Sequence, residues 1–472
     1  GSQQRLVLEL FRERGEMSLH ELGRRLRSPR ATVRSLQQRG LLATEEREVP
    51  ADRFFSTAVE PERPFELTPE QLQAVEAIKG QLERGGAFLV HGVTGSGKTE
   101  VYLRVIAEAR ARNLGALVLV PEIALTPQLV ARFRARFGDA IAVLHSGLGN
   151  RQRYEAWQCL RRGLVTLAIG ARSALFAPVH RLGVVIVDEE HDGSFKQEEG
   201  FRYHARDLAL MRAHRAGAVC VLGSATPSVE SFHGARQGRL QLLVLPRRVT
   251  GHALPEVQLV DLGRHRGGPS GHRLLTGPMH QALQECLLSG GQAILFINRR
   301  GFAPSVHCTG CGELQQCPAC SVALTEHRRA GTLLCHYCGF STPDTDRCLY
   351  CGSGELERTG IGTEKLEVAL KECFDSIRVA RLDRDTAVGE GIERVLDRLR
   401  RREIDVLVGT QMVTKGHDIP GVTLVGVMLA DQSLAFPDFR AAERTFQLLA
   451  QVAGRAGRGK KAGRGLVQSY QP

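Results

Sequence analysis

With 472 residues, 42% of them hydrophobic, the chain is long enough for three or four domains with substantial cores. A net charge of +12 favours a polyanionic partner, although charge alone does not identify one. No apolar run approaches the roughly 18 residues that a membrane-spanning helix needs, and the N-terminus lacks a signal-peptide apolar region, so we expect a cytoplasmic protein. Gly1-Ser2 is typical of a cloning remnant, and we expect the natural start to be missing.

The first fifty residues read as three short helices. Apolar residues recur at helical spacing over 4–14, Ser18 caps a second helix over 19–26, and Ser28-Pro29 opens a third that Gly40 stops. A charged, strand-like segment through Val49 follows. This pattern is typical of a winged helix, whose third helix often enters a DNA groove. A small helical docking domain is the alternative, because winged helices also serve as protein adaptors.

After a linker over 51–64, the chain alternates strand-like apolar runs with helical stretches. The runs before residue 245 lie at 87–90, 116–120, 141–144, 165–169, 184–187 and 218–222. Later runs lie at 293–297, 378–382, 406–408, 424–429 and 465–468. Near-continuous apolar strands that alternate with helices predict doubly wound parallel sheets, so we expect an α/β fold of two similar lobes.

A glycine-rich loop follows the first of these strands, with the sequence Gly92-Val93-Thr94-Gly95-Ser96-Gly97-Lys98-Thr99, and a helix is predicted over 100–111. Glycines such as Gly92, Gly95 and Gly97 let backbone N–H groups curl around phosphate oxygens. Lys98 can then reach the β- and γ-phosphates, and the Thr99 hydroxyl can ligate Mg²⁺. The strand–loop–helix context predicts a nucleotide site.

The acidic box Asp188-Glu189-Glu190-His191 follows another apolar run, at the sheet edge where ligands of open α/β folds bind. Asp188 would hold Mg²⁺ through water, and Glu189 would orient and deprotonate the water that attacks the γ-phosphate. His191 could link the nucleotide state to the neighbouring segment. Acidic residues after a strand often form only a solvated loop, but the phosphate loop upstream argues for an NTP-hydrolysing motor.

Aromatic and cationic side chains are interleaved directly after this box, over 194–206. The aromatic rings could stack on unpaired bases while Lys196, Arg202 and Arg206 meet phosphates, in which case DNA occupancy could be sensed at Glu189. A loop whose aromatic side chains pack against the sheet is the alternative.

Eight of the twelve cysteines form four CxxC pairs inside one short stretch, which in a cytosolic chain indicates a metal site rather than disulfides. They are Cys308, Cys311, Cys317, Cys320, Cys335, Cys338, Cys348 and Cys351. Eight thiolates supply two tetrahedral zinc sites with no open position, hence structural sites that substitute for a core. An iron–sulfur cluster is the rival, which the spacing disfavours.

A double-arginine motif closes the series at 451–458, where Arg455 and Arg458 project from one face of a helical turn. A guanidinium is a permanent cation that can contact phosphate in bidentate fashion, which suits transition-state charge. Coming from the other lobe, such arginines would make hydrolysis depend on closure between lobes. A basic surface patch is the alternative.

In this order the motifs resemble those of superfamily 2 helicases of the DEAH type, and specifically those of the bacterial primosomal replication-restart helicases. The resemblance is carried by the cysteines and by segments 67–71, 92–99, 119–128, 169–174, 188–191, 223–228, 298–301, 409–418 and 451–458. It covers 65–472, and the eight-cysteine insertion is particular to this family among helicases. It implies two RecA-like lobes with a two-zinc domain inserted in the second.

The expected domains are a winged helix over 1–50, a first lobe over 65–245, a second lobe over 246–306 and 354–472, and a zinc domain over 307–353. The family has further N-terminal and C-terminal domains, so we expect the sequence to be a winged-helix-plus-motor part of a longer protein. Fork selectivity and part of the partner surface are then in doubt for it.

The resemblance also implies residue roles. Gln71 would read adenine, Gln451 would join the ATP site, and Arg455 and Arg458 would be arginine fingers. Lys98, Thr99, Asp188 and Glu189 would handle phosphates, Mg²⁺ and water. The single strand would lie along Arg172, Ser173, Asn298, Arg299 and Lys415. The outer cysteine pairs (Cys308, Cys311, Cys348 and Cys351) would share one zinc ion and the inner pairs the other.

The family acts as a 3′→5′ DNA translocase that recognises abandoned forks and helps reload the replicative helicase. The resemblance therefore implies ATP, Mg²⁺ and two Zn²⁺ as cofactors. It implies single-stranded and forked DNA, single-stranded-DNA-binding protein and helicase-loading proteins as partners, at forks in the bacterial nucleoid. A fork-binding scaffold that has lost motor activity is the alternative, and an RNA helicase is disfavoured by the zinc insertion.

Overall fold

The computed structural model describes most of the chain. The described residues are 2–15, 17, 22, 29–44, 59–121, 127–251, 253–265, 268, 275–297, 305–308, 311, 313–320, 322–327, 330–344, 347–352, 356–359, 363–383, 391–410, 419, 421–434, 438–457 and 462–470. The chain divides into two compact units, 1–54 and 55–472. Within the described residues, no helix combines the length and the apolar character that crossing a bilayer requires.

The first unit contains the helices α1 (Ser2–Arg14) and α3 (Pro29–Gln38), which agree with the first and third predicted helices. Their apolar faces bury Val7 and Leu36 in a small core that Leu22 joins. The rest of the predicted second helix and the segment through Val49 lie outside the described residues, so the winged helix stays a prediction.

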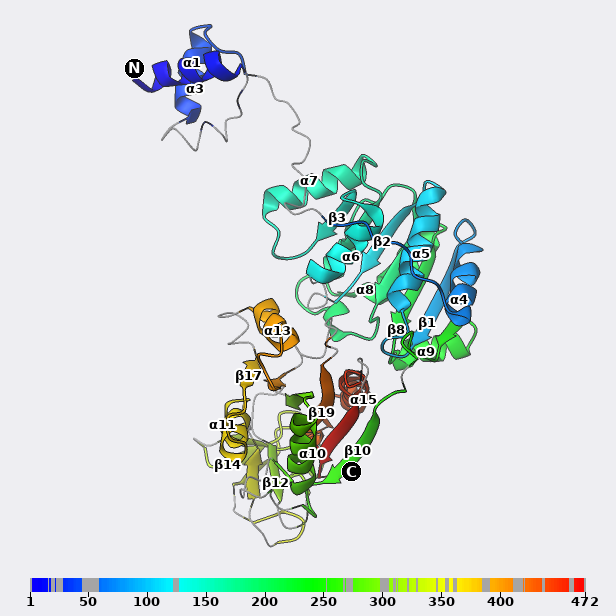
Figure 1. Ribbon diagram of the computed structural model, residues 1–472, viewed down its shortest axis with the longest axis vertical. Coiled ribbons are helices and arrows are strands. Elements are labelled where there is room, and N and C mark those ends of the chain that lie inside the picture. The colour runs from blue at the N-terminus through cyan, green and yellow to red at the C-terminus, as the bar shows by residue number, and fades with distance from the viewer. Residues whose placement is uncertain are drawn as a thin grey trace. The chain divides into compact units, whose positions relative to one another are not determined.

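The first lobe of the second unit is a seven-stranded parallel sheet in the order β3-β4-β2-β5-β8-β1-β9 (Figure 1). Its strands are β1 (Gly86–Gly92), β2 (Gly115–Leu119), β3 (Ile141–Leu144), β4 (Leu167–Gly170), β5 (Leu182–Asp188), β8 (Val219–Ser224) and β9 (Gln241–Leu245). Its helices are α4 (Pro69–Lys79), α5 (Lys98–Ala111), α6 (Pro127–Phe137), α7 (Asn150–Arg161), α8 (Ala205–Arg215) and α9 (Val229–Arg236). The short strands β6 (Lys196–Gln197) and β7 (Tyr203–His204) pair beside it.

The strand order decides where chemistry can occur in this lobe. Because β5, β8 and β1 are neighbours and all strands are parallel, the loops that follow them meet at one edge of the sheet. The apolar runs predicted as strands form the buried centre, with Phe88, Val118 and Ile186 nearly inaccessible to solvent. The phosphate loop, the acidic box and Ser224 are thereby brought together.

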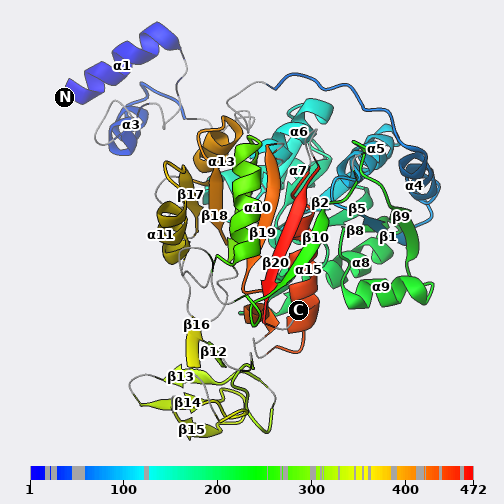
Figure 2. The same cartoon turned by 60° about the horizontal axis from the view of Figure 1, so that its bottom comes forward.

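The second lobe is a six-stranded parallel sheet in the order β10-β20-β19-β11-β18-β17 (Figure 2). Its strands are β10 (Glu256–Asp261), β11 (Gln292–Ile297), β17 (Val379–Leu382), β18 (Val406–Gly409), β19 (Val422–Met428) and β20 (Arg464–Ser469). Its helices are α10 (Gly277–Leu288), α11 (Thr363–Cys373), α13 (Ile392–Arg400), α14 (Asp431–Leu434) and α15 (Ala441–Ala453).

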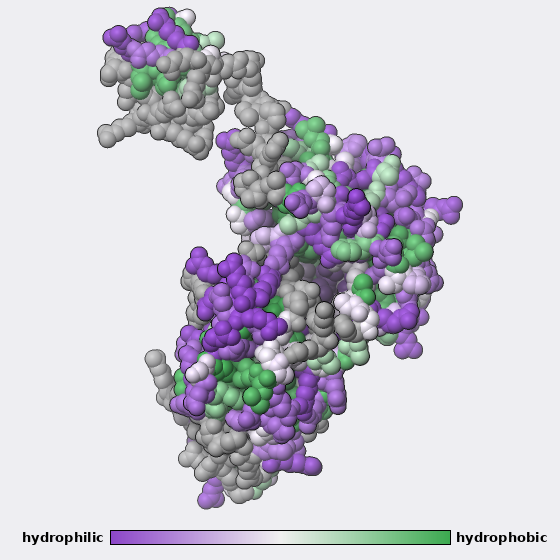
Figure 3. Space-filling view, in the orientation of Figure 1, coloured by the Kyte–Doolittle hydropathy of each residue, from purple (hydrophilic) through white to green (hydrophobic). Residues whose placement is uncertain are grey.

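Alternation along β11 separates two cores in this lobe, because successive strand side chains point to opposite faces. Ile294 and Phe296 pack with residues of α13 and α15, whereas Leu295 packs with residues of α10 and α11. The sheet is therefore covered on both faces, as predicted for a doubly wound fold. Over α13 the visible surface is strongly hydrophilic (Figure 3), and Val395, Leu396 and Leu399 of that helix are buried.

An antiparallel sheet interrupts the second lobe between β11 and α11. Its strands are β12 (Ser305–Cys308), β13 (Thr325–His327), β14 (Thr332–Leu334), β15 (Ser341–Pro343) and β16 (Leu356–Thr359). The fold class predicted from the sequence is confirmed in its two parallel-sheet lobes and its cysteine-rich insertion. The strands β9 and β10, the β6–β7 pair and the strands of the insertion were not predicted; those of two or three residues are too short for a periodic apolar signal.

Candidate nucleotide site and metal centres

The phosphate loop leads from β1 directly into the N-terminus of α5. Gly95 and Gly97 have positive φ angles of 85° and 78°, a backbone conformation that glycine adopts without strain. A Cβ atom at Gly97 would lie only 2.3 Å from the Gln71 amide nitrogen. Lys98 Nζ donates to the Gly92 carbonyl oxygen at 2.9 Å, so the lysine closes the loop on itself. The N–H groups at a helix start, together with a lysine, make this loop a candidate site for phosphates.

Gln71 supports this loop from the preceding helix. Its side-chain nitrogen donates to the Ser96 carbonyl oxygen at 2.8 Å, and its side-chain oxygen accepts from the Thr68 backbone N–H at 2.9 Å. The second bond is half of a capping box that starts α4. Gln71 is therefore a buried side chain that connects α4 to the loop by hydrogen bonds, and its contact with adenine stays a prediction.

Asp188, the last residue of β5, is partly buried beside a tyrosine that the sequence analysis did not consider. The Tyr102 hydroxyl donates to Asp188 Oδ1 at 3.0 Å. A Cβ atom at Gly223, which pairs with Asp188 across the strands, would lie 1.6 Å from that hydroxyl oxygen, so only glycine fits. Tyr102 lies four residues after Lys98 on α5, and this spacing was the available signal, because it places both side chains on one helix face.

Burial raises the pKa of Asp188 to about 6, with the negative charge of Glu189 adding to the shift and Lys98 and the tyrosine hydrogen bond opposing it. Burial likewise raises the pKa of Tyr102 well above its usual value, so its hydroxyl remains a donor. Because its charged form is disfavoured by desolvation, this carboxylate is suited to a bound cation. Glu189 follows with a φ of 49°, which turns the chain sharply after the strand.

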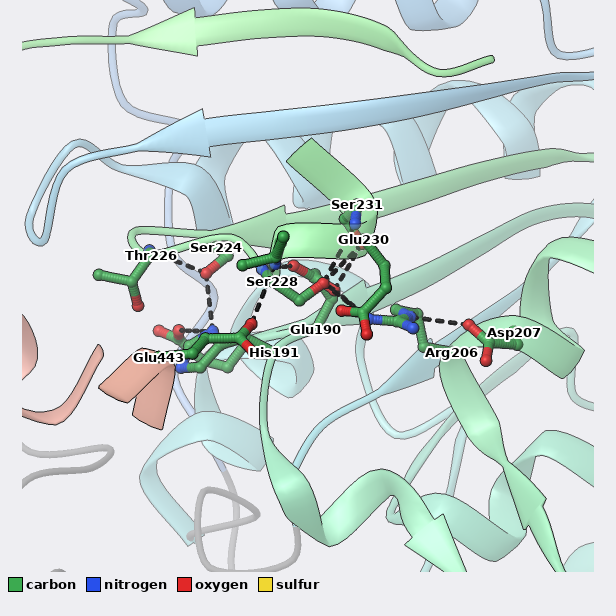
Figure 4. Close-up of polar contacts among 12 residues, drawn as sticks. Glu190, His191, Arg206, Asp207, Ser224, Thr226, Ser228, Glu230, Ser231 and Glu443 are labelled. Carbon is green, nitrogen blue, oxygen red and sulfur yellow. Dashed lines mark hydrogen bonds and ion pairs between the residues drawn. The ribbon is translucent and has the colours of Figure 1, made fainter. Parts of the chain in front are cut away.

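His191 connects the two lobes. Its Nε2 lies 2.8 Å from the amide nitrogen of Gln451, at the end of α15. Since an amide nitrogen can only donate, Nε2 accepts and Nδ1 carries the proton. Nδ1 therefore donates to Ser224 Oγ at 2.7 Å, a bond shown in Figure 4. The acidic box, the end of β8 and the double-arginine motif thus form one hydrogen-bonded path.

Glu190 is fully buried and anchors the start of α9 (Figure 4). Its carboxylate accepts from the Ser228 N–H at 2.7 Å and from the Ser231 hydroxyl at 2.8 Å. Arg206 Nη1 completes the site, at 3.4 Å from Glu190 Oε2 and 2.7 Å from Ser228 Oγ. Beyond this anchor, the Val229 N–H donates to a Glu443 side-chain oxygen of the second lobe at 2.9 Å.

The expectation that Arg206 meets DNA phosphates is not supported by this arrangement. Arg206 is only 7% exposed, and its guanidinium compensates the charge of Glu190, which is shielded from water. By contrast, Lys196 and Arg202 of the same segment are exposed. The alternation of aromatic and cationic residues in the sequence does not indicate which arginine is buried and which is exposed.

Aromatic side chains gather beside these exposed cations. Tyr203 lies with its ring centroid 5.2 Å from that of Phe176 and 5.8 Å from that of Phe201, and Phe201 is 73% exposed. Arg172 donates to the backbone carbonyls of Ser194 and Lys196, which fixes the loop that bears this cluster. Phe176 and Phe201 are exposed and suit the base-stacking interpretation, whereas Phe195 of the same segment is fully buried, as the packing alternative expects.

The remaining predicted residues are only partly described. Ser173 is exposed in the short helix 172–176, and Arg455 is half-buried in the turn after α15. Arg458, Asn298, Arg299 and Lys415 lie outside the described residues, so their roles stay predictions.

The eight clustered cysteines converge in two groups whose sulfur atoms lie within 4.8 Å of one another. One group is Cys308, Cys311, Cys348 and Cys351, and the other is Cys317, Cys320, Cys335 and Cys338, the pairing that the resemblance implied. Sulfur separations of 3.6 Å for Cys308–Cys351 and 3.7 Å for Cys311–Cys348 match the roughly 3.8 Å edge of a tetrahedron with Zn–S bonds of about 2.3 Å.

Polar groups around the sulfurs also suit thiolates. The Gln315 amide nitrogen lies 3.3 Å from Cys348 Sγ, and the Tyr350 and Tyr337 backbone N–H groups lie 3.3 Å and 3.4 Å from Cys348 Sγ and Cys335 Sγ. Such donors orient metal-bound thiolates and offset their charge. Both groups therefore fit structural zinc.

Comparison with known proteins agrees with this geometry. The DEAD/DEAH box helicase family matches residues 68–233, the helicase conserved C-terminal domain matches 356–460, and the PriA DNA helicase Cys-rich region matches 317–343. Replication restart protein PriA of Bacillus subtilis (strain 168) is 45% identical over 455 residues, which is 96% of this chain and 56% of that protein. The chain therefore spans little more than half of that relative's length.

Two further relatives give the same result. Replication restart protein PriA of Synechocystis sp. is 43% identical over 480 aligned residues, covering 100% of this chain and 57% of that protein. The protein of the same name from Haemophilus influenzae is 45% identical over 386 residues, covering 82% of this chain and 52% of that protein. Two parallel-sheet lobes, paired cysteine sites and these identities place the chain in the PriA family of DEAD/DEAH box helicases.

Proposed function

We propose that this chain is the motor part of an ATP-dependent DNA helicase that acts in replication restart. The observation that carries the proposal is the path from Ser224 through His191 to Gln451, which joins the nucleotide edge of the first lobe to the second. A path between lobes is what a motor needs, because movement along a strand requires hydrolysis to alter how two bodies fit together.

In the proposed reaction Lys98 and the N–H groups of the phosphate loop hold the β- and γ-phosphates, and Thr99 and Asp188 hold Mg²⁺. The metal ion, when bound, neutralises charge on the phosphate oxygens. The raised pKa of Asp188 fits this role, because a bound cation would offset the free-energy cost of keeping this carboxylate ionised. Glu189 then orients the attacking water and takes its proton.

Arg455 and Arg458 are proposed to stabilise the charge that develops on the transferring phosphate. The turn that contains Arg455 packs on the phosphate loop, since a Cβ atom at Gly454 would lie 3.0 Å from Thr94 Oγ1. Each ATP would close the lobes on one strand and hydrolysis would reopen them. We propose 3′→5′ movement on the family resemblance alone.

For DNA, we propose a path along Arg172, Ser173, Lys196, Arg202 and the exposed aromatic cluster, continuing through Asn298, Arg299 and Lys415. The exposed cations and rings support this path, and Arg206 no longer belongs to it. Because Glu189 precedes the aromatic segment by only a few residues, DNA on the rings could be sensed at the catalytic water.

The finer functions rest on the relatives. We propose that the protein recognises stalled forks and helps reload the replicative helicase, with single-stranded-DNA-binding protein and loading proteins as partners, in the cytoplasm at nucleoid-associated forks. The zinc domain, with its two proposed zinc ions, is the proposed surface for part of these contacts.

The alternative is a fork-binding scaffold without a working motor. The presence of Lys98, Asp188 and Glu189 argues against it, because a partly buried carboxylate with a raised pKa beside a phosphate loop is costly to maintain without a function. The test is steady-state ATP hydrolysis with and without single-stranded or forked DNA, in the wild type and in Glu189→Gln. Strong DNA stimulation that the variant loses supports the motor, whereas no turnover in protein that still binds forks favours the scaffold.

A further inference from the structure

An arginine between the two sheets contacts both halves of the nucleotide site. Arg248 lies in the segment between β9 and β10, where the chain passes from the first lobe to the second. Its side chain is only 6% exposed, although a guanidinium in a connecting segment would ordinarily extend into solvent. No role for it followed from the sequence motifs.

The guanidinium of Arg248 reaches the turn that bears Arg455. Nη2 donates to the Gly454 carbonyl oxygen at 2.9 Å, and Nη1 donates to the Gly457 and Ala456 carbonyl oxygens at 3.0 and 3.3 Å. These carbonyls lie on both sides of Arg455. A planar fork of donors can hold several carbonyls of one turn in a fixed arrangement, whereas the single nitrogen of a lysine, with its rotating donors, would fix them less well.

The backbone and stem of the same segment lie on the phosphate loop. The Val249 N–H donates to the Gly95 carbonyl oxygen at 3.1 Å, and the Val93 N–H donates to the Leu245 carbonyl oxygen at 3.1 Å. A Cβ atom at Gly95 would lie 3.6 Å from Arg248 Cγ, so the aliphatic stem rests on the glycine. The segment is thus tied to the loop on either side of Arg248.

A segment that only connects two lobes could pack through apolar side chains at a lower free-energy cost, because burying a guanidinium removes its hydration. Here the charge is placed on the carbonyls of the turn that follows α15, at the loop proposed to hold the phosphates. The three hydrogen bonds fix both the distance and the orientation of that turn relative to Gly95.

We propose that Arg248 is a positioning residue for ATP hydrolysis. It holds the Gly454–Gly457 turn against the phosphate loop, so that Arg455 is directed at the transferring phosphate. This inference rests on the proposed function, because it takes Arg455 to be an arginine finger. Arg248 itself does not touch the nucleotide in this scheme.

The test compares Arg248→Gln and Arg248→Lys with Arg247→Gln, a matched control at the adjacent residue, whose side chain is 76% exposed and pairs with Glu70. DNA-stimulated kcat, KM for ATP, binding of a fluorescent ADP analogue and the thermal midpoint are measured for each. Arg248→Gln is expected to lower kcat by about tenfold to a hundredfold, the scale of a misplaced catalytic group, with KM and ADP binding within about threefold. The kcat of Arg248→Lys is expected to lie between those of the wild type and Arg248→Gln, and the kcat of Arg247→Gln is expected to stay within about twofold of the wild type.

The deciding readout is a double-mutant cycle with Arg455→Ala. If Arg248 acts by positioning Arg455, then in the Arg455→Ala background Arg248→Gln or Arg248→Lys lowers kcat by less than about twofold. Equal losses in both backgrounds, or a normal kcat in folded Arg248→Gln, overturn the positioning role. A normal kcat in Arg455→Ala instead overturns the arginine-finger assignment, and no DNA-stimulated turnover in the wild type overturns the proposed function. The Lys variant keeps the test available if the Gln variant does not fold.

Discussion

Beneath the phosphate loop, the first lobe buries a continuous set of apolar side chains from seven strands and their helices, and its functional residues stand at the edge of that core. The cysteine-rich insertion buries few apolar side chains, among them Val306, Leu324 and Leu333, together with four of its cysteines. In the lobe the fold exists independently of Lys98 or Asp188. In the insertion the proposed ligands are themselves part of the core, so chemistry and stability cannot be separated there.

The largest expected effect is the loss of turnover in Lys98→Ala. Lys98 donates its hydrogen bond to Gly92 of its own loop, so its removal should leave the core intact and lower kcat by at least about a thousandfold, because a phosphate contact made in the transition state is lost. Steady-state ATP hydrolysis, DNA binding and thermal unfolding of the variant check this. Equal losses of DNA binding and turnover in a folded variant would contradict the phosphate assignment.

Zinc removal, unlike the loss of Lys98, should disrupt local structure and leave basal ATP hydrolysis largely intact. Without metal, the insertion has too small a core to hold its strands, so we expect fork unwinding to fall by about tenfold or more while basal ATP hydrolysis stays within about twofold. Metal content, unwinding and hydrolysis are measured on the same chelated sample. Normal unwinding by protein without zinc would sink the idea that the insertion depends on metal.

Two arginines of one segment should separate stability from DNA binding. Arg206→Ala leaves the Glu190 carboxylate buried without its guanidinium, and we expect the free energy of unfolding to fall by about 3 kcal/mol. The exposed Arg202→Ala should leave stability unchanged, weaken single-strand binding a few-fold and reduce the salt dependence of binding by about one charge. Denaturant unfolding and salt titrations of binding measure both. The reverse pattern would restore Arg206 to the DNA path.

The smallest expected effect is a gain in stability. Burial raises the folded-state pKa of Asp188 from 3.8 to about 6, so the folded protein holds this proton more tightly than the unfolded chain does. The stability from this carboxyl is present below the unfolded pKa and is lost as pH rises through 6. Asp188→Asn should therefore stabilise the metal-free protein at pH 7.5, by on the order of 2 kcal/mol, and by less than half of that at pH 4.5, while abolishing turnover. Equal thermal shifts at both pH values would argue against an ionised carboxylate with a raised pKa.

Much of the site could be predicted because its signals are local. The phosphate loop, the acidic box and the CxxC pairs each depend on a few consecutive residues, and the structure places them as those spacings implied. Tyr102, Arg248 and the anchoring role of Glu190 were missed, because their partners are distant in sequence: Asp188 for the first, the Gly454–Gly457 turn for the second, and Ser228 for the third.

By itself, the sequence indicated the two-lobed α/β architecture, a phosphate-binding loop and eight clustered cysteines, because apolar periodicity, glycine spacing and CxxC pairs act over short distances along the chain. Only the tertiary structure decided which charges are buried and which are exposed. Arg206 and Arg202 are alike as residue types, yet one compensates Glu190 in the interior and the other faces solvent. Burial depends on the packing of distant segments, and the free-energy cost of an unpaired charge then fixes what each arginine can do.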